Sequence, residues 1–238
     1  MQVVDRPELC LLSSPEDRPV FNAVLRSRGS ASRLPALVGE VRAAHAGRRP
    51  RWMLGPLDAA VGLEPLLRAA GYQPGEEHDG YSHPTDGALR PLPADIEARA
   101  VQDLDGMRDW VEVSGRAFGE PRVPDRAELR LFLSQCTGPG ARVFRAVAYD
   151  RGSGAPLSAG GLTLFPRLGF GMLWAGGTVP EARGRGAWTA VLAARRDHAF
   201  RLGIGRIGLY ARRSSSGPLV ARMGFARHGP MIFWEHLC

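Results

Sequence analysis

Three stretches in the middle of the chain alternate apolar and polar positions as half-buried strands do, with glycine-containing turns between them. These stretches are Ala141–Asp150, Leu157–Pro166 and Phe170–Val179. Before them, a helical spacing of apolar positions predicts two helices, Asp103–Phe118 and Asp125–Cys136, the second capped by the side chain of Asp125. The pattern therefore predicts an antiparallel sheet with helices packed against it.

The third strand leads through Pro180 and a tight turn into a long amphipathic helix, predicted at Ala187–Leu202. The turn has the sequence Arg183-Gly184-Arg185-Gly186. The first N–H groups of a helix have no intrahelical partner and the helix dipole adds partial positive charge, so this junction predicts an anion site. The two glycines let the backbone approach a bulky diphosphate, and the two arginines add charge-assisted donors.

Two common phosphate-binding loops do not fit this junction. A Walker A loop needs a lysine after its second glycine, and all 31 basic residues of the chain are arginines. A Rossmann loop needs a third glycine, but Gly186 is followed by Ala187, Trp188 and Thr189. An ordinary surface turn before a helix stays an alternative at this point.

The segment after the helix adds a second pattern. A short strand at Arg206–Ala211 is followed by a serine-rich turn and a short helix, Gly217–Met223. Serine at the N-cap and glycine after the last turn are typical helix boundaries, and this helix ends at Gly224-Phe225, before a last strand.

These residues resemble the cofactor motifs of the GCN5-related N-acetyltransferases, the GNAT superfamily. The family pattern V-x-P-x-x-R-G-x-G is matched by Val179, Pro180, Arg183, Gly184 and Gly186. Trp188 departs from it, since the family prefers glycine or alanine there. The resemblance covers about residues 96–238. It implies an α/β (α+β) fold, with a mixed, mainly antiparallel central sheet flanked by helices.

The resemblance also implies acetyl-CoA as the cofactor, with its pantetheine arm along the third strand and its diphosphate at the helix start. The implied cofactor-binding residues are Gly177, Thr178, Val179, Arg183, Gly184, Arg185, Gly186, Ala187 and Trp188. A primary amine then attacks the thioester, which requires positioning, a base, and donors for the oxyanion. A backbone N–H between Gly176 and Thr178 is the implied oxyanion donor.

The catalytic groups are harder to assign, because Val220 stands where many GNAT enzymes have the tyrosine that protonates the leaving thiolate. Candidate acids nearby are Tyr210, Ser215 and Ser216, and water is the alternative. Glu120, in the loop after the first helix, and Glu181, beside the turn, are candidate bases; a solvated surface carboxylate is the alternative for each. Glu120, Tyr210 and Ser216 are the predicted catalytic residues.

The N-terminal part of the chain contains a shorter series of elements. They are a strand at Leu9–Leu12, helices at Arg18–Arg26 and at Arg33–Ala46 (capped by Ser32), a strand at Arg51–Leu54 and a helix at Val61–Ala70. Gly62–Tyr72 and Ser216–Phe225 share a helix between a strand and a glycine–aromatic stop, which is a weak internal repeat. We therefore predict a degenerate GNAT-like domain at residues 1–90 that binds no cofactor, a linker at Gly80–Pro93, and an acetyltransferase domain at residues 94–238.

Composition limits the partners. The net charge of +7 comes from arginine alone, as in sequences from GC-rich genomes, and no arginine run alternates with aromatic residues, so no nucleic-acid partner is expected. No apolar run is long enough to cross a membrane, and the histidines and cysteines form no metal-binding pattern. Three scattered cysteines fit a reducing compartment, so we expect a cytoplasmic protein.

The leading hypothesis is an acetyl-CoA-dependent N-acetyltransferase that modifies a primary amine of a small molecule or a protein, as a monomer or homodimer. The alternative is a catalytically quiet module that binds acyl-CoA or a protein partner, for which Val220 and the degenerate N-terminal part are the evidence. The tandem arrangement also resembles mycothiol synthase, whose acceptor is a cysteinyl sugar. The acceptor itself is not identified by the sequence.

Overall fold

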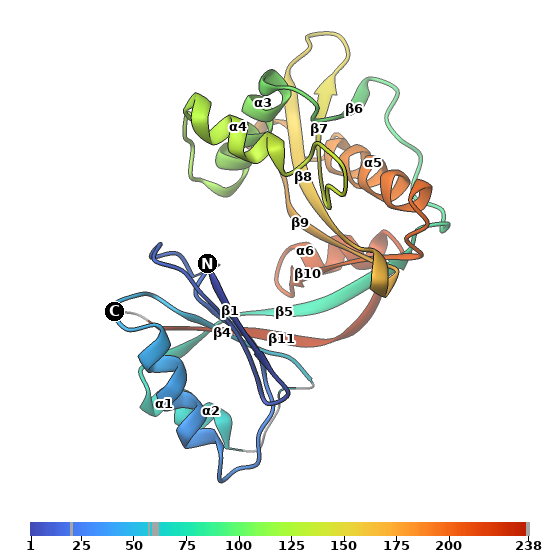
Figure 1. Cartoon of the computed structure of the whole chain (residues 1–238). Coiled ribbons are helices and arrows are strands. Elements are labelled where there is room, and N and C mark those ends of the chain that lie inside the picture. Colours follow the sequence, from blue (N-terminus) through green and yellow to red (C-terminus); the bar gives the residue numbers. More distant parts are fainter. Residues whose placement is uncertain (20, 57, 59–61, 237–238) are drawn as a thin grey trace. The chain divides into compact units, whose positions relative to one another are not determined.

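The computed structural model describes residues 1–19, 21–56, 58 and 62–236, and their contacts divide the chain into two compact units. The first unit contains the described residues of Met1–Tyr81, Tyr210–Ala221 and Arg227–Cys238. The second contains Ser82–Leu209 and Arg222–Ala226. Each unit is therefore built from segments that are far apart in the sequence, as the colours of Figure 1 show.

The described strands of the first unit follow the order β1-β2-β3-β4-β11-β5. They are β1 (Gln2–Arg6), β2 (Leu9–Ser13), β3 (Ala23–Ser27), β4 (Arg51–Leu54), β5 (Tyr72–Pro84) and β11 (Ala226–His236); the helices are α1 (Leu34–Ala44), α2 (Leu63–Ala69) and α6 (Ser216–Arg222). Trp52 of β4 and Trp234 of β11 face each other in an antiparallel ladder and are fully buried. The C-terminal strand thus completes the core of the N-terminal segment.

The sequence predicted a helix at Arg18–Arg26, and this prediction is wrong, because Ala23–Ser27 form β3 between β2 and β4. Asn22 explains the difference. Its buried side chain accepts from the Ser14 N–H at 2.9 Å and donates to the Glu16 carbonyl at 2.6 Å. These bonds fix a turn before the strand, as asparagine side chains often do when they compete with helix formation.

Other boundaries in this unit also differ from the prediction. Ser32 does not cap α1: the N-cap is Arg33, which makes no side-chain cap bond, and the Ser32 hydroxyl pairs with that of Ser30. Residues 80–84, predicted as part of a linker, belong to β5. The strands predicted at β2 and β4 are confirmed, and α2 confirms most of the helix predicted at Val61–Ala70, of which Val61 lies outside the described residues.

The second unit has the strand order β10-β9-β8-β7-β6, with α3 and α4 on one face of the sheet and α5 on the other (Figure 1). Its elements are β6 (Ile96–Ala100), α3 (Leu104–Phe118), α4 (Arg126–Ser134), β7 (Val143–Asp150), β8 (Pro156–Phe165), β9 (Phe170–Thr178), α5 (Ala187–Arg201) and β10 (Arg206–Arg212), with short 3-10 turns η1 (Pro166–Leu168) and η2 (Pro180–Ala182). Strands β6 to β9 pair antiparallel, and β10 joins β9 in parallel. The predicted elements of this region and the mixed, mainly antiparallel fold are confirmed, with small differences at element ends.

The predicted domains were continuous, whereas the contact units are not. β11 pairs with β4, and residues 210–221 also group with the N-terminal segment. The domain limits at residues 1–90 and 94–238 therefore stay a prediction. The structure divides the chain differently, into two units that are each made of separate segments.

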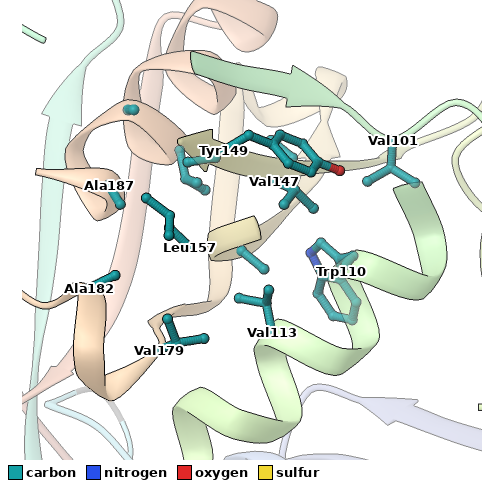
Figure 2. Close-up of a cluster of buried hydrophobic side chains, with 14 of the residues drawn as sticks. Val101, Trp110, Val113, Val147, Tyr149, Leu157, Val179, Ala182 and Ala187 are labelled. Atoms are coloured by element: carbon teal, nitrogen blue, oxygen red, sulfur yellow. The ribbon is translucent and has the colours of Figure 1, made fainter. Parts of the chain in front are cut away.

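Figure 2 shows the core of the second unit, where side chains of α3 and of the sheet meet the end of β9 and the start of α5. The labelled buried residues are Val101, Trp110, Val113, Val147, Tyr149, Leu157, Val179, Ala182 and Ala187. Each fully buried side chain of valine or leucine size contributes about 1.5–3 kcal/mol relative to exposure. This core is therefore a firm base for the turn that joins β9 to α5.

Candidate functional site at the start of helix α5

The turn between β9 and α5 is anchored at both ends by buried side chains. Val179, Ala182 and Ala187 each keep only 1% of their surface exposed, and Figure 2 shows all three in the core. Residues 183–185, between them, are exposed. The structure therefore presents this part of the turn to solvent from a well-packed base.

The first turn of α5 has no side-chain cap. Its N-cap is Gly186, with no side-chain cap bond and no acidic residue in the first turn. The first intrahelical bond runs from the Ala190 N–H to the Gly186 carbonyl at 3.1 Å. The N–H groups of Ala187, Trp188 and Thr189 precede this ladder, and N–H groups at such a position, together with the helix dipole, favour an anion.

The backbone requires glycine at two positions of the turn. Gly184 (φ 82°) and Gly186 (φ 87°) lie in the left-handed region, where most residues are strained. A Cβ at Gly186 would also lie 2.5 Å from Pro93 Cγ, whereas nothing lies within 4 Å of a Cβ at Gly184. Gly184 thus leaves open space beside the helix start.

The two arginines of the turn differ in what they bind. Arg185 donates from Nη2 to Asp95 Oδ2 at 3.0 Å and to Asp150 Oδ2 at 2.5 Å. This guanidinium, with hydrogen bonds from Ser153, holds the pKa of Asp150 well below its usual range. Arg183 is exposed and has no ion pair within the described ranges of the chain. Of the two arginines, Arg183 is therefore the one whose guanidinium is exposed and not held by a carboxylate of the described residues.

Beside the turn, β9 pairs with β10 only at its beginning. Within the residues that the structure describes, the parallel ladder joins Arg206–Gly208 to Phe170–Met172, and β9 continues to Thr178. On the opposite side, the Val179 N–H donates to the Leu157 carbonyl at 2.9 Å. Since peptide groups alternate in direction along a strand, the N–H of Thr178 points away from β8, toward the β10 side.

A bulge interrupts β9 next to this edge. The register with β8 shifts so that Ala175 and Gly176 lie opposite the single residue Gly160. Ala175 has φ 47°, and no other non-glycine residue with positive φ occurs in the described part of the chain. The Ser158 hydroxyl donates to the Gly177 carbonyl at 2.8 Å and fixes the end of the bulge. A bulge turns backbone N–H groups out of the regular ladder, as an oxyanion donor in this segment requires.

The predicted catalytic residues fall in different units. Glu120 lies in the second unit, in the exposed loop after α3, where its N–H donates to the Gly115 carbonyl at 2.8 Å. Tyr210 belongs to the first unit and is 37% exposed, and burial raises the pKa of its phenol. Ser216 begins α6 and its hydroxyl accepts from the Arg212 N–H at 3.0 Å. All three roles stay predictions.

The structure also shows the surroundings of Glu181 and Val220, two positions that the sequence analysis considered. Glu181 bonds its own N–H and pairs with Arg116, and both interactions lower the pKa of its carboxyl, which weakens it as a base. Val220, at the position of the family tyrosine, is fully buried.

One charged residue near the bulge was not among the sequence predictions. Arg195 of α5 is 1% exposed. Arg195 lies four residues from Val191 and from Ala199, on the buried face of the helix that also includes Ala187. An arginine in the middle of an otherwise apolar helix face is the sequence signal that could have identified it.

The described residues contain no helix long and apolar enough to span a membrane. Nor does this part of the chain hold a group of three or more side chains that could bind a metal ion.

Comparison with known proteins gives matches among solved structures. No family model matches the chain, and no match is found among curated proteins. A GCN5-related N-acetyltransferase from Kribbella flavida has a TM-score of 0.77 at 16% identity, covering 100% of this chain and 90% of that one. One from Sphaerobacter thermophilus has a TM-score of 0.68 at 19% identity, covering 96% and 80%. A tandem GNAT protein from the clavulanic acid biosynthesis pathway has a TM-score of 0.63 at 14% identity, covering 95% and 77%.

Identities this low establish shape and leave the substrate open. The strand, the glycine turn and the uncapped helix stand where the family motif predicted them. The chain therefore has the fold of the GCN5-related N-acetyltransferases.

Proposed function

We propose that this protein is an acetyl-CoA-dependent N-acetyltransferase that acetylates a primary amine of a small molecule or a protein. The observation that carries the proposal is the uncapped start of α5 beside the open edge of β9. N–H groups at a helix start bind phosphate oxygens, and an open strand edge pairs with the amides of an extended chain. Acetyl-CoA offers both a diphosphate and an amide-containing arm.

The residues around the turn fit this cofactor in charge and in space. The first turn of α5 has no carboxylate, Gly184 has open space beside it, and Arg183 is exposed. Bound acetyl-CoA would supply an acetyl group activated as a thioester. Residues 183–188 hold the diphosphate, and the main chain of residues 177–179 orients the arm.

The remaining chemistry belongs to the chain. The amine nitrogen forms a bond to the carbonyl carbon, the carbon–sulfur bond breaks, and the products are an amide and the free thiol. An N–H between Gly176 and Thr178 stabilises the oxyanion. Glu120 takes the proton of the attacking ammonium, and water, the alternative to a side-chain acid, returns one to the thiolate.

Calorimetry on the full chain tests the cofactor. We expect one acetyl-CoA or CoA per chain, with a binding free energy of about −5 to −8 kcal/mol. Arg183→Gln should weaken binding by about three- to tenfold, because it removes a charge-assisted donor. Arg167→Gln, at an exposed arginine of η1, is the matched control and should change nothing. Flat titrations with both ligands would overturn the cofactor assignment.

Release of free thiol from acetyl-CoA in the presence of a panel of amines tests the reaction. Turnover of one amine class above the rate without amine supports the transferase. Binding of acetyl-CoA without turnover of any amine supports the alternative, a quiet acyl-CoA-binding module, which the buried valine at position 220 favours.

A further inference from the structure

Arg195 is a buried cation with an incomplete set of partners. Its side chain is 1% exposed, and no ion pair of Arg195 occurs among the residues described. Nε donates to the Val191 carbonyl and Nη1 to the Gly161 carbonyl, each at 3.1 Å. Nη2 has no hydrogen bond in the described ranges. A guanidinium carries five donors, so part of its capacity is unused.

The unused end of this guanidinium lies against the bulge of β9. A Cβ on Gly160 would lie 2.7 Å from Cζ and Nη1, and a Cβ on Gly176 would lie 3.4 Å from Nη2. Gly160 and Gly176 are the residues that face each other across the bulge. The absence of side chains at both positions therefore makes the space that the guanidinium fills.

Burying the charge of Arg195 destabilises the folded protein, which suggests a functional role for this side chain. An ion without a counter-charge is unfavourable in a protein interior, and a leucine would suit the stripe of Val191 and Ala199. Burial lowers the pKa of Arg195 to about 9, so the side chain still carries its proton at neutral pH. The chain thus keeps a positive charge where an apolar side chain would pack.

The other buried arginine of this unit, Arg145, uses both Nη atoms in hydrogen bonds, although its Nε has no partner among the described residues. Arg145 donates to the Phe132 carbonyl, the Cys136 sulfur and Gln135. It also lies 5.0–5.5 Å from the ring centres of Trp110, Phe132 and Trp174. Such contacts stabilise a desolvated cation. Arg195 has no ring stacked on it in the described residues, and its spare donors face the bulge.

We propose that Arg195 is a positioning residue for acetyl transfer, whose buried charge holds the β9 bulge in shape and favours negative charge on the thioester carbonyl oxygen at the N–H groups of the bulge. This inference rests on the proposed function. A fixed positive charge lowers the energy of negative charge that develops near it during the reaction. Arg195 keeps all its protons throughout; the amine nitrogen–carbon bond forms, the carbon–sulfur bond breaks, and the protons move through the groups named above.

The test compares Arg195→Met, which keeps an unbranched apolar stem and removes the charge, with the control Arg201→Met, at an exposed arginine of the same helix. Infrared difference spectra of bound acetyl-CoA labelled with 13C at the carbonyl report its polarisation without any acceptor. We expect Arg195→Met to move the carbonyl stretch toward its value in free acetyl-CoA and to lower kcat more than tenfold, with CoA affinity within about twofold of the wild type. Arg201→Met should leave all three unchanged.

A folded Arg195→Met protein with the wild-type carbonyl stretch and kcat would overturn the inference. If that variant does not fold, Arg195→Lys decides. A buried lysine has a lowered pKa, so the stretch and kcat should be close to wild type at low pH and lost as the lysine deprotonates. A lysine variant whose two readouts do not change with pH would contradict the proposed role. If the wild type does not bind acetyl-CoA, both the proposed function and this inference are overturned. If the wild type binds it and only the variants behave otherwise than expected, this inference alone is overturned.

Discussion

Helices α3 and α4 begin with closed ends, and α5 begins with an open one, although all three start in the same unit. Asp103 accepts from the Gly106 N–H and Asp125 from the Glu128 N–H, each at 2.8 Å, and both helices have an acidic residue in the first turn. α5 has Gly186 in the left-handed region and neither device. A side-chain cap is worth about 1 kcal/mol, so the open end forgoes stability that its neighbours have.

The comparison indicates where an anion belongs. Four N–H groups at each helix start need partners, and a carboxylate of the chain already serves the starts of α3 and α4. At α5 no side-chain cap is present, and the turn before the helix contains glycines and arginines, so the N–H groups are left for water or for the proposed anion. Among α3, α4 and α5, the helix with the open start is the one that follows the bulged strand.

Closing the open end with a charge should give the largest effect. Gly184→Asp and Gly184→Asn place nearly identical side chains in open space, at a backbone conformation that both residues tolerate. The aspartate should weaken CoA binding at least about tenfold relative to the asparagine, roughly 1.4 kcal/mol, through repulsion of the diphosphate. Calorimetry measures this difference.

The same pair at Gly203, which is also left-handed and open, is the control at the other end of α5. Equal affinities of the two Gly184 variants would place the diphosphate elsewhere. Gly186 suits this test less well, because a Cβ there meets Pro93 and strain would mix with charge.

Opening a closed end should cost stability and leave the ligand unaffected. Asp103→Ala removes the cap of α3, and we expect a loss of about 1 kcal/mol in the free energy of unfolding with unchanged CoA affinity. Urea denaturation and calorimetry give the two values. Asp103→Asn keeps an acceptor for the Gly106 N–H and should recover most of the stability. A drop in CoA affinity for the alanine variant would mean that the two helix starts are not independent.

Thr189→Glu gives α5 the acid that its neighbours already have. A carboxylate in the first turn stabilises a helix by about 0.3–1 kcal/mol, so the free protein should become slightly more stable. The same charge competes with a phosphate and should weaken CoA binding about two- to fivefold. Thr189→Gln controls for the side chain. We expect the melting temperature to rise while the affinity for CoA falls. A change of both quantities in the same direction would contradict the prediction.

The parts of the molecule that the sequence predicted well are those governed by local chemistry. Asp103 and Asp125 allow the starts of their helices to be predicted, because an N-cap side chain bonds to a backbone N–H only three residues later. The strand at Ala23–Ser27 was missed because its stability comes from β2 and β4, which lie elsewhere in the chain. β11 was placed with the C-terminal elements, although its ladder partner is β4. Helical periodicity carries no information about such pairings.

The candidate site divides in the same way. The turn and the helix start follow from neighbouring residues and were predicted as such. The guanidinium of Arg185 is engaged by Asp95 and Asp150, which are 90 and 35 positions away in the sequence. No motif contains these two residues. The spare donors of Arg195 depend on where two glycines of different strands meet.

The smallest expected effect comes from releasing Arg185. Asp150 accepts from the turn N–H groups with Oδ1 and from Arg185 with Oδ2, so Asp150→Asn keeps the first role and loses the second. The freed guanidinium, still beside Asp95, should raise CoA affinity by up to about twofold, in keeping with an exposed ion pair. The control is Asp105→Asn, which alters an exposed ion pair with Arg108.

The same variant has a predictable pH dependence. The pKa of Asp150 is lowered in the folded protein, so its contribution to stability is complete above the unfolded pKa, about 3.9, and is lost as pH falls through the lower folded value. Asp150→Asn should therefore be less stable than the wild type at neutral pH, and the two should converge below about pH 4. Chemical denaturation at a series of pH values measures this. A stability difference that stays constant down to pH 2 would mean that Arg185 does not hold Asp150 ionised, and its guanidinium would then be available to a ligand like that of Arg183.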